Sequence, residues 1–367
     1  MEIIIKRKDF IKVLDKVSEV ISPKPAINIL NGILIETKEE EIFLTATDLE
    51  NTIRTSIEGK ILNKGAILIQ GKKLTSLIKQ LDDEEIKITT QESQINIHSK
   101  NSIYTFIGMN YEEFPKLPKF SGGVTIKLDS LFLKNTIEKS KFCIYPDEPR
   151  PYFRGALLEI KNKFFNFVAT DTKRLSLIKT QLQQEIQEPV KCLLPYKLLN
   201  LLPNILEEGE IEISIGKNQI FFKINNIFLT AQLLEGSQDF PDYEKAIPDE
   251  KKIKTAYINK NIFLSTLKRI SLFTSERYNK VKFTFSKQKL NLYTNSPEIG
   301  EAQEKIIVEY DGDEQAIAFN PEYLLDFLQK AEGEKIIFGF TNDKKPALLK
   351  TDKDPGYIYV AMPLKLD

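Results

Sequence analysis

One pattern recurs three times in this 367-residue chain, and it constrains the fold more than any other feature. The segment IFLTATDLENTI at residues 42–53 has a counterpart, FNFVATDTKRLSLI, at residues 165–178, about 123 positions later. A third segment, LNLYTNSPEIGEA at residues 290–302, follows at a similar interval. Solenoid repeats have periods of roughly 20 to 50 residues. The longer interval instead indicates three copies of a whole domain.

A proline-containing landmark separates the copies. EFP at residues 113–115 is followed by Pro118, and DFP at residues 239–241 is followed by Pro248. Proline disrupts both helices and central strands, so each landmark is typical of a linker. We therefore predict three domains: residues 1–120, 121–248 and 249–367.

Within each third the same order of elements repeats: a helix, several strands, a second helix and several strands again. Apolar residues at helical spacing predict helices at 8–21, 72–81, 130–142, 196–206, 260–273 and 320–330. The last has Asn320 as N-cap, Pro321 at its first position and Gly333 beyond its end. The strands alternate, as in residues 210–234, where Gly-Lys-Asn-Gln at 216–219 forms the hairpin turn. The predicted fold class is α+β, with two helices packed on antiparallel sheets in each domain.

Composition excludes several classes of protein. With 41% hydrophobic and 28% charged residues, the chain is neither collagen-like nor wholly disordered. Its two cysteines, Cys143 and Cys192, cannot form a disulfide framework. No apolar run approaches the roughly 18 residues of a membrane span, and the N-terminus lacks the apolar core of a signal peptide. We therefore expect a cytoplasmic protein with no membrane partner.

Residues that carry most chemistry at neutral pH are scarce. The single histidine, His98, lies in an alternating segment, where a solvated strand position is the simpler interpretation. A His/Cys zinc site would need more ligands at a useful spacing. The segment GAILIQGKK at 65–73 does not match a P-loop, because five residues separate its glycines and Lys73 replaces the required Ser or Thr. We expect no metal and no cofactor.

Two aspartates could be imagined as a catalytic pair. Asp48 and Asp171 each follow Ala-Thr at the end of an apolar strand. An aspartate at such a position usually bonds to its own backbone and stabilises a turn. A hydrolase built on these two residues therefore remains the weakest functional hypothesis, and we predict a protein that is not an enzyme.

The formal net charge is zero, from 52 basic and 52 acidic residues, but the charges are unevenly placed. The six predicted helices carry 14 basic and 6 acidic residues, so they are +8 and the rest of the chain is −8. Ordinary solvation of helices by lysine is one interpretation. If the helices line one face, that face would instead bind the phosphate backbone of a duplex without reading bases.

The segments ATDTKRL (169–175), DFPDYEKAIP (239–248) and YVAMPLKL (359–366) closely resemble the bacterial sliding-clamp family, the β subunit of DNA polymerase III. The resemblance covers essentially the whole chain, including the threefold repeat. It implies the DNA-clamp fold and a non-catalytic processivity subunit of a DNA-directed DNA polymerase. In that family two protomers close head to tail into a ring around double-stranded DNA. A clamp loader opens the ring onto primed template, and the ring tethers replicative and repair polymerases.

The resemblance also implies which residues bind partners. A hydrophobic cleft for partner peptides would be formed by Phe153, Thr170, Thr172, Lys173, Arg174, Leu175, Pro241, Lys245, Ala246, Tyr278, Tyr323, Val360, Met362, Pro363, Leu364 and Lys365. Apolar side chains and a methionine suit a site that accepts many partners. By pattern alone, the alternating Val360, Met362 and Leu364 could equally belong to a half-buried strand. Thr172-Lys173 replaces a Gly-His pair of some relatives, and Ala246 replaces a larger aliphatic residue.

Two further surfaces follow from the same resemblance. The implied DNA contacts are Lys24, Lys72, Lys79, Arg150, Tyr152, Lys173, Lys197 and Lys282. The implied interface of the homodimer joins Tyr104 and Phe106 of one protomer to Leu272 and Phe273 of the other. A peptide-binding scaffold whose association with DNA is incidental is the alternative hypothesis.

Overall fold

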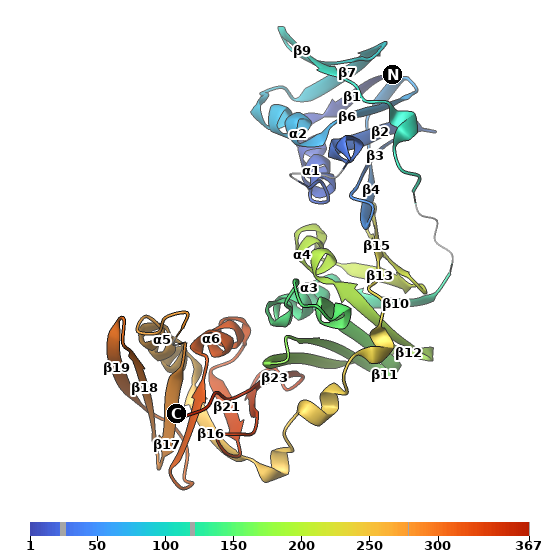
Figure 1. Cartoon of the computed structure of the whole chain (residues 1–367). Helices are drawn as coiled ribbons and strands as arrows, with labels where there is room; N and C mark the ends of the chain where they lie inside the picture. Colours follow the sequence, from blue (N-terminus) through green and yellow to red (C-terminus); the bar gives the residue numbers. More distant parts are fainter. Residues whose placement is uncertain (23–26, 118–121, 278, 367) are drawn as a thin grey trace. The chain divides into compact units, whose positions relative to one another are not determined.

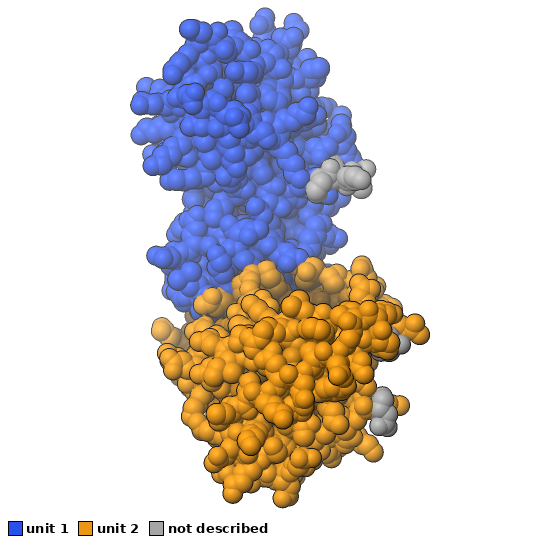
Figure 2. All heavy atoms as spheres, turned by 90° about the vertical axis from the view of Figure 1, so that its left-hand side faces the viewer, with its two compact units in different colours: residues 1–134, 197–233 blue, residues 135–196, 234–367 orange. Residues whose placement is uncertain are grey.

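The computed structural model describes residues 1–22, 27–117, 122–277 and 279–366. These residues form two compact units, which Figure 2 distinguishes by colour. Unit 1 consists of residues 1–134 and 197–233, and unit 2 of residues 135–196 and 234–367. Among the described residues, the helices are too short and too polar to cross a membrane.

Unit 1 contains two antiparallel sheets (Figure 1). The five-stranded sheet has the order β5-β1-β7-β8-β9, and the eight-stranded sheet has the order β10-β13-β14-β15-β4-β3-β2-β6. The strands are β1 (Glu2–Lys6), β2 (Gly32–Lys38), β3 (Glu41–Thr47), β4 (Asn51–Ile57), β5 (Lys60–Asn63), β6 (Ala66–Gln70), β7 (Glu85–Gln91), β8 (Gln94–Ser99), β9 (Ser102–Ile107), β10 (Val124–Asp129), β13 (Glu210–Ile215), β14 (Gln219–Ile224) and β15 (Ile227–Gln232). The predicted hairpin turn is present, because the Gly216 N–H donates to the Gln219 carbonyl.

Unit 2 also contains two antiparallel sheets. The six-stranded sheet has the order β11-β12-β23-β22-β21-β16, and the four-stranded sheet has the order β19-β18-β17-β20. The strands are β11 (Gly155–Thr170), β12 (Arg174–Pro195), β16 (Lys254–Asn259), β17 (Val281–Ser286), β18 (Lys289–Ser296), β19 (Gly300–Ile307), β20 (Gln315–Phe319), β21 (Lys335–Phe340), β22 (Ala347–Thr351) and β23 (Tyr357–Ala361).

All six predicted helices are present, with somewhat different ends. They are α1 (Arg7–Ser18), α2 (Gly71–Gln80), α3 (Ser130–Glu138), α4 (Tyr196–Ile205), α5 (Lys260–Ser271) and α6 (Pro321–Lys330). In α1, Phe10, Leu14 and Val17 form the buried stripe. Asn320 caps α6 by accepting from the Glu322 N–H, as its sequence predicts.

The predicted helix 130–142 is shorter than expected. It ends at Glu138, and a 3-10 turn follows at Lys141–Cys143. The Ser140 hydroxyl donates to the carbonyls of Thr136 and Ile137. A serine side chain that bonds to the backbone in this way competes with helical hydrogen bonding, which accounts for the early end.

The sheets extend across the thirds of the sequence, which the pattern of elements does not predict. In unit 1, β15 of the central third pairs with β4 of the first third, with Leu229 opposite Ile53. In unit 2, β12 of the central third pairs with β23 of the last third, with Leu175 opposite Val360. Each pairing covers strand edges that would otherwise be exposed. The second pairing forms the floor of the site described next.

Candidate functional site

The turn between β11 and β12 is built by its own side chains. The Thr170 hydroxyl donates to the Arg174 carbonyl and accepts from the Thr172 N–H. The Asp171 carboxylate accepts from the N–H groups of Lys173 and Arg174. Side chains of the turn itself thus satisfy several of its backbone groups.

The turn between β3 and β4 repeats the same construction. The Thr47 hydroxyl donates to the Asn51 carbonyl and accepts from the Leu49 N–H. The Asp48 carboxylate accepts from the N–H groups of Glu50 and Asn51. Both aspartates of the imagined hydrolase therefore form turns.

Each turn places one non-glycine residue in the left-handed region of the backbone. The φ angle is 78° at Leu49 and 73° at Thr172. A β-branched residue rarely adopts this conformation, because its Cβ crowds the backbone. The turn at Thr172 is therefore strained, and it lies at the edge of a cavity.

That cavity, of about 190 Å³, lies in unit 2 beside the turn. Its lining comes from the 3-10 turn Pro151–Phe153, the ends of β11, β12 and β23, and the segment 240–246. Ten of the sixteen predicted cleft residues line it: Phe153, Thr170, Thr172, Lys173, Arg174, Leu175, Pro241, Ala246, Val360 and Met362. The structure thus brings together residues that are up to about 200 positions apart in sequence.

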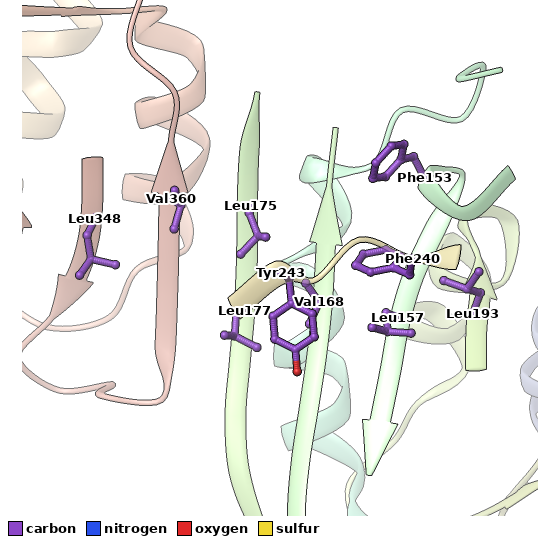
Figure 3. Packing of buried hydrophobic residues seen from close by; sticks show 10 residues of the cluster. All are labelled: Phe153, Leu157, Val168, Leu175, Leu177, Leu193, Phe240, Tyr243, Leu348 and Val360. Carbon is purple, nitrogen blue, oxygen red and sulfur yellow. The ribbon is translucent and has the colours of Figure 1, made fainter. Parts of the chain in front are cut away.

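The floor of the cavity is a buried apolar cluster (Figure 3). Leu175 and Val360 lie opposite each other on the paired strands β12 and β23 and are only 5% and 3% exposed. Phe153 packs edge-on against Phe240, with ring centroids 6.1 Å apart. Met362 lies at the rim and is 39% exposed, with its N–H bonded to the Lys173 carbonyl. The cavity therefore offers a firm apolar floor and one adaptable thioether.

Arg174 is a half-buried cation whose donors are already used. Its guanidinium donates to the carboxylates of Asp171 and Asp326 and to the Phe142 carbonyl. The ring of Tyr323 lies 4.6 Å from the guanidinium carbon. Arg174 therefore links the turn to α6 and holds the shape of the cavity.

Five other predicted cleft residues do not line the cavity. Lys245 is exposed and forms an ion pair with Asp242 at 3.0 Å. Tyr323 lies behind Arg174, and Pro363, Leu364 and Lys365 follow Met362 along the chain. Tyr278 lies outside the described residues.

The prediction missed three lining residues: Phe240, Asp242 and Tyr243. Phe240 and Tyr243 are 4% and 7% exposed and belong to the cluster under the cavity. The DFP motif contains the signal, but of its three residues the prediction assigns only Pro241 to the cleft. An aromatic residue next to a proline in a polar segment could have indicated an anchor.

The predicted DNA contacts in unit 1 differ in their availability. Lys72 and Lys79 are exposed on α2, and Lys79 pairs with Asp15 of α1 at 2.6 Å. Lys197, at the start of α4, pairs with Asp48 and Glu50 at 2.8 Å each. Partial burial would lower the pKa of Lys197, but the two carboxylates outweigh it and raise that pKa. Lys24 lies outside the described residues.

The predicted DNA contacts in unit 2 surround the cavity or lie on β17. Arg150 pairs with Glu148 at 2.6 Å and stacks on the Phe153 ring at 4.5 Å. Tyr152 is half-buried and packs edge-on against the same ring. Lys173 and Lys282 are exposed.

The predicted interface residues lie at exposed apolar places. Tyr104 and Phe106 belong to β9, the edge strand of the five-stranded sheet in unit 1, and Tyr104 is 38% exposed. Leu272 and Phe273 follow α5 in unit 2 and are 73% and 37% exposed. A further apolar residue is exposed on β19, the edge strand of the four-stranded sheet, where Ile307 is 83% exposed.

Comparisons with known proteins agree over the whole chain. Models for the N-terminal, central and C-terminal domains of the DNA polymerase III beta subunit match residues 1–118, 127–242 and 244–365. A "Beta sliding clamp" of Chlamydia pneumoniae is 30% identical over 100% of this chain and 99% of its own length. Another, of Staphylococcus epidermidis, is 32% identical over the same shares.

Solved structures of sliding clamps have the same fold. The DNA polymerase III subunit beta of Pseudomonas aeruginosa is 26% identical, with a TM-score of 0.95. The DNA polymerase sliding clamp of Bacillus subtilis is 28% identical, also with a TM-score of 0.95. Both alignments cover 100% of each chain. They confirm the predicted α+β fold class, and the relatives confirm the prediction of a non-catalytic replication subunit. The chain belongs to the DNA polymerase III beta subunit family, the bacterial sliding clamps.

Proposed function

We propose that this sliding clamp encircles duplex DNA as a head-to-tail homodimeric ring and tethers polymerases through the cavity of unit 2. The observation that carries the proposal is the convergence of ten predicted residues on one apolar cavity. The predicted boundaries near residues 120 and 248 would give three domains per protomer and six per ring. A clamp loader would open the ring onto primed template in the cytoplasm.

The cavity suits a short peptide that contains leucine and phenylalanine. Leu175 and Val360 form a floor that a partner's side chain can cover, and Met362 can adjust its rotamer to different partners. Because Arg174 already has three acceptors, it positions the turn rather than binding the partner directly. Replicative and repair polymerases would compete for the same site.

The exposed edge strands support the homodimer. β9 has an unpaired edge with Ile103 and Ile107 exposed, and β19 has an unpaired edge with Ile307 exposed. Free apolar edges invite pairing with another chain. Contact between different surfaces of two protomers closes into a ring when the rotation allows.

The charge distribution supports DNA inside the ring. With their observed ends, the six helices carry 13 basic and 5 acidic residues, so the imbalance of +8 persists. Contacts to phosphates alone would allow the ring to slide, because they carry no sequence information. A ring is held on DNA by its topology, so a protein with no net charge can still stay bound.

Sedimentation velocity tests the homodimer. Wild type at micromolar concentration is expected to sediment as a dimer, whereas Ile107→Lys is expected to sediment as a monomer because it places a charge on the β9 edge. Phe228→Lys places the same charge on an exposed side chain of β15, away from the β9 edge (Phe228 is 49% exposed and Ile107 82%), and this control should remain dimeric. A monomeric wild type would contradict the ring.

The peptide-binding scaffold remains the second candidate, because Lys79, Arg150 and Lys197 pair with carboxylates of the same chain. Charge reversal at Lys72, Lys79 and Lys197 separates the two functions. The clamp hypothesis expects weaker retention on DNA and unchanged peptide binding. Unchanged DNA loading and processivity would favour the scaffold.

A further inference from the structure

A second groove, of about 630 Å³, adjoins the cavity in unit 2. Its floor is one face of β11 and β12, and its wall is the segment Phe240–Glu244. It is lined by Glu159, Lys161, Phe164, Asn166, Lys179, Lys191, Phe240, Pro241, Asp242, Tyr243 and Glu244. Four consecutive residues, 240–243, line both the cavity and this groove, so a peptide chain can pass from one to the other over a single loop.

Tyr243 fixes the boundary between the two depressions. Its ring belongs to the apolar cluster under the cavity. On the groove side, its hydroxyl donates to the Glu159 carboxylate at 2.6 Å and accepts from the Asn166 amide at 3.2 Å. Figure 3 shows the hydroxyl directed away from Phe240. The shared loop is therefore anchored from both sides, and the groove is a formed surface.

The positive charges of the groove are less fully paired than its negative ones. Each carboxylate has a protein partner: the Tyr243 hydroxyl for Glu159, Lys245 for Asp242 and Lys179 for Glu244. The ammonium groups of Lys161 and Lys191 form no hydrogen bond or ion pair with any other described residue, although Lys191 lies opposite Glu159 in the β11–β12 register. Their ammonium groups are therefore available to carboxylates of a bound chain.

One aromatic side chain in the groove is exposed to solvent. Phe164 is 54% exposed although it lies on a strand of a regular sheet, opposite Gln181. An exposed ring in a groove that also contains two unpaired lysine ammonium groups offers a stacking surface for an apolar side chain that has acidic neighbours. The chemistry of the groove thus differs from that of the cavity, which is mainly apolar.

We propose that this groove binds the residues that flank the Leu/Phe motif of a partner peptide, and that it prefers a flank with carboxylates around one aromatic side chain. The inference rests on the proposed peptide cleft. It adds a second contact to each partner, through which partners with similar motifs can differ in affinity.

Fluorescence anisotropy with labelled peptides tests the proposal. All peptides share the core Ala-Leu-Ser-Leu-Phe. One has no flank, and the others carry Glu-Phe-Glu or Lys-Phe-Lys at either end. The groove adjoins only one end of the bound core, so the flanks should differ in effect at one end of the peptide only. At that end, the peptide with the acidic flank is expected to bind about ten-fold more tightly than the peptide with the basic flank, as two exposed ion pairs and a ring contact would allow. The difference should shrink at high salt.

Variants assign the effect to the groove. K161E/K191E should reverse the preference between the two flanks, and F164A should weaken the acidic-flank peptide about three-fold. K163E is the matched control, because Lys163 is exposed on the same strand but does not line the groove. Unchanged affinity for the core peptide reports that each variant is folded.

The outcomes separate this proposal from the cleft itself. Failure of the core peptide to bind wild type would overturn both. Binding of the core with equal affinity for the two flanks would overturn the groove alone. The groove proposal is also overturned if K161E/K191E changes only retention on DNA, because the lysines would then bind nucleic acid.

Discussion

Replacing Leu175 by alanine should weaken peptide binding and stability together, whereas the same change at Leu177 should weaken stability alone. Both leucines lie on β12 and belong to the same buried cluster, with exposed fractions of 5% and 0%. Only Leu175 lines the cavity. The pair therefore separates the effect of the cleft from the effect of core packing.

The expected magnitudes follow from burial. Each Leu→Ala change should lower the free energy of unfolding by about 2 to 4 kcal/mol, because it removes buried methyl groups and leaves a cavity. Leu175 is 5% exposed, so a bound peptide would also lose about 20 Å² of apolar contact, counting both partners, which is about 0.5 kcal/mol at 25 cal/mol/Å². The affinity for the core peptide should therefore fall about two-fold. Adding Met362→Ala should increase this loss, since Met362 forms part of the same lining.

Urea unfolding measures the stability of each variant, and fluorescence anisotropy below the unfolding transition measures its affinity. The expected result is that L175A binds the core peptide about two-fold more weakly than L177A, with similar losses of stability in the two variants. Equal affinities for the two variants would refute the assignment of Leu175 to a partner-binding cleft.

Three further results are expected. Lys139 is 9% exposed and pairs with Glu332 and Asp354. K139M should lower the free energy of unfolding of the protein by about 2 to 3 kcal/mol. An unchanged urea midpoint would mean that these ion pairs contribute nothing to stability. The Lys139 ammonium lowers the pKa of Glu332, so this stabilisation is present above the carboxyl's ordinary pKa of 4.5 and is lost as the pH falls through the lowered value. E332Q should therefore show a flatter pH dependence of stability in that range, and curves parallel to wild type would contradict the assignment. Thr172→Gly should raise the free energy of unfolding by about 0.5 to 1 kcal/mol, because the strain of a side chain in the left-handed region exceeds the entropic cost of glycine. Leu49→Gly, at the matching turn, should have a similar effect. A lower melting temperature in both variants would disprove this.

Local sequence signals predicted much of this fold. The six helices follow from apolar periodicity, and the cap at Asn320 and the turns around Asp48 and Asp171 involve only neighbouring residues. Such features are determined within a few residues, so a single sequence contains them. The repeat adds that the turns at residues 47–51 and 170–174 should be alike, and their hydrogen bonds are the same.

Long-range features could not be predicted in the same way. Alternation identifies strands such as β12 and β15 but not the partners with which they pair, so sheets shared between thirds were missed. The ion pairs of Lys197 with Asp48 and Glu50 join segments about 150 positions apart, and no local pattern indicates them. Most of the cleft came from the resemblance to sliding clamps, since Leu175 and Val360 by pattern alone are ordinary buried strand residues.

Retention on circular and linear DNA tests the central claim most directly. The protein is incubated with a bacterial clamp loader and a primed circular plasmid, and bound protein is measured by gel filtration before and after a restriction enzyme cuts the circle. A ring that encloses DNA should remain on the closed circle and be lost from the cut one within minutes. Equal retention on both forms would mean that the protein binds the surface of DNA and does not encircle it.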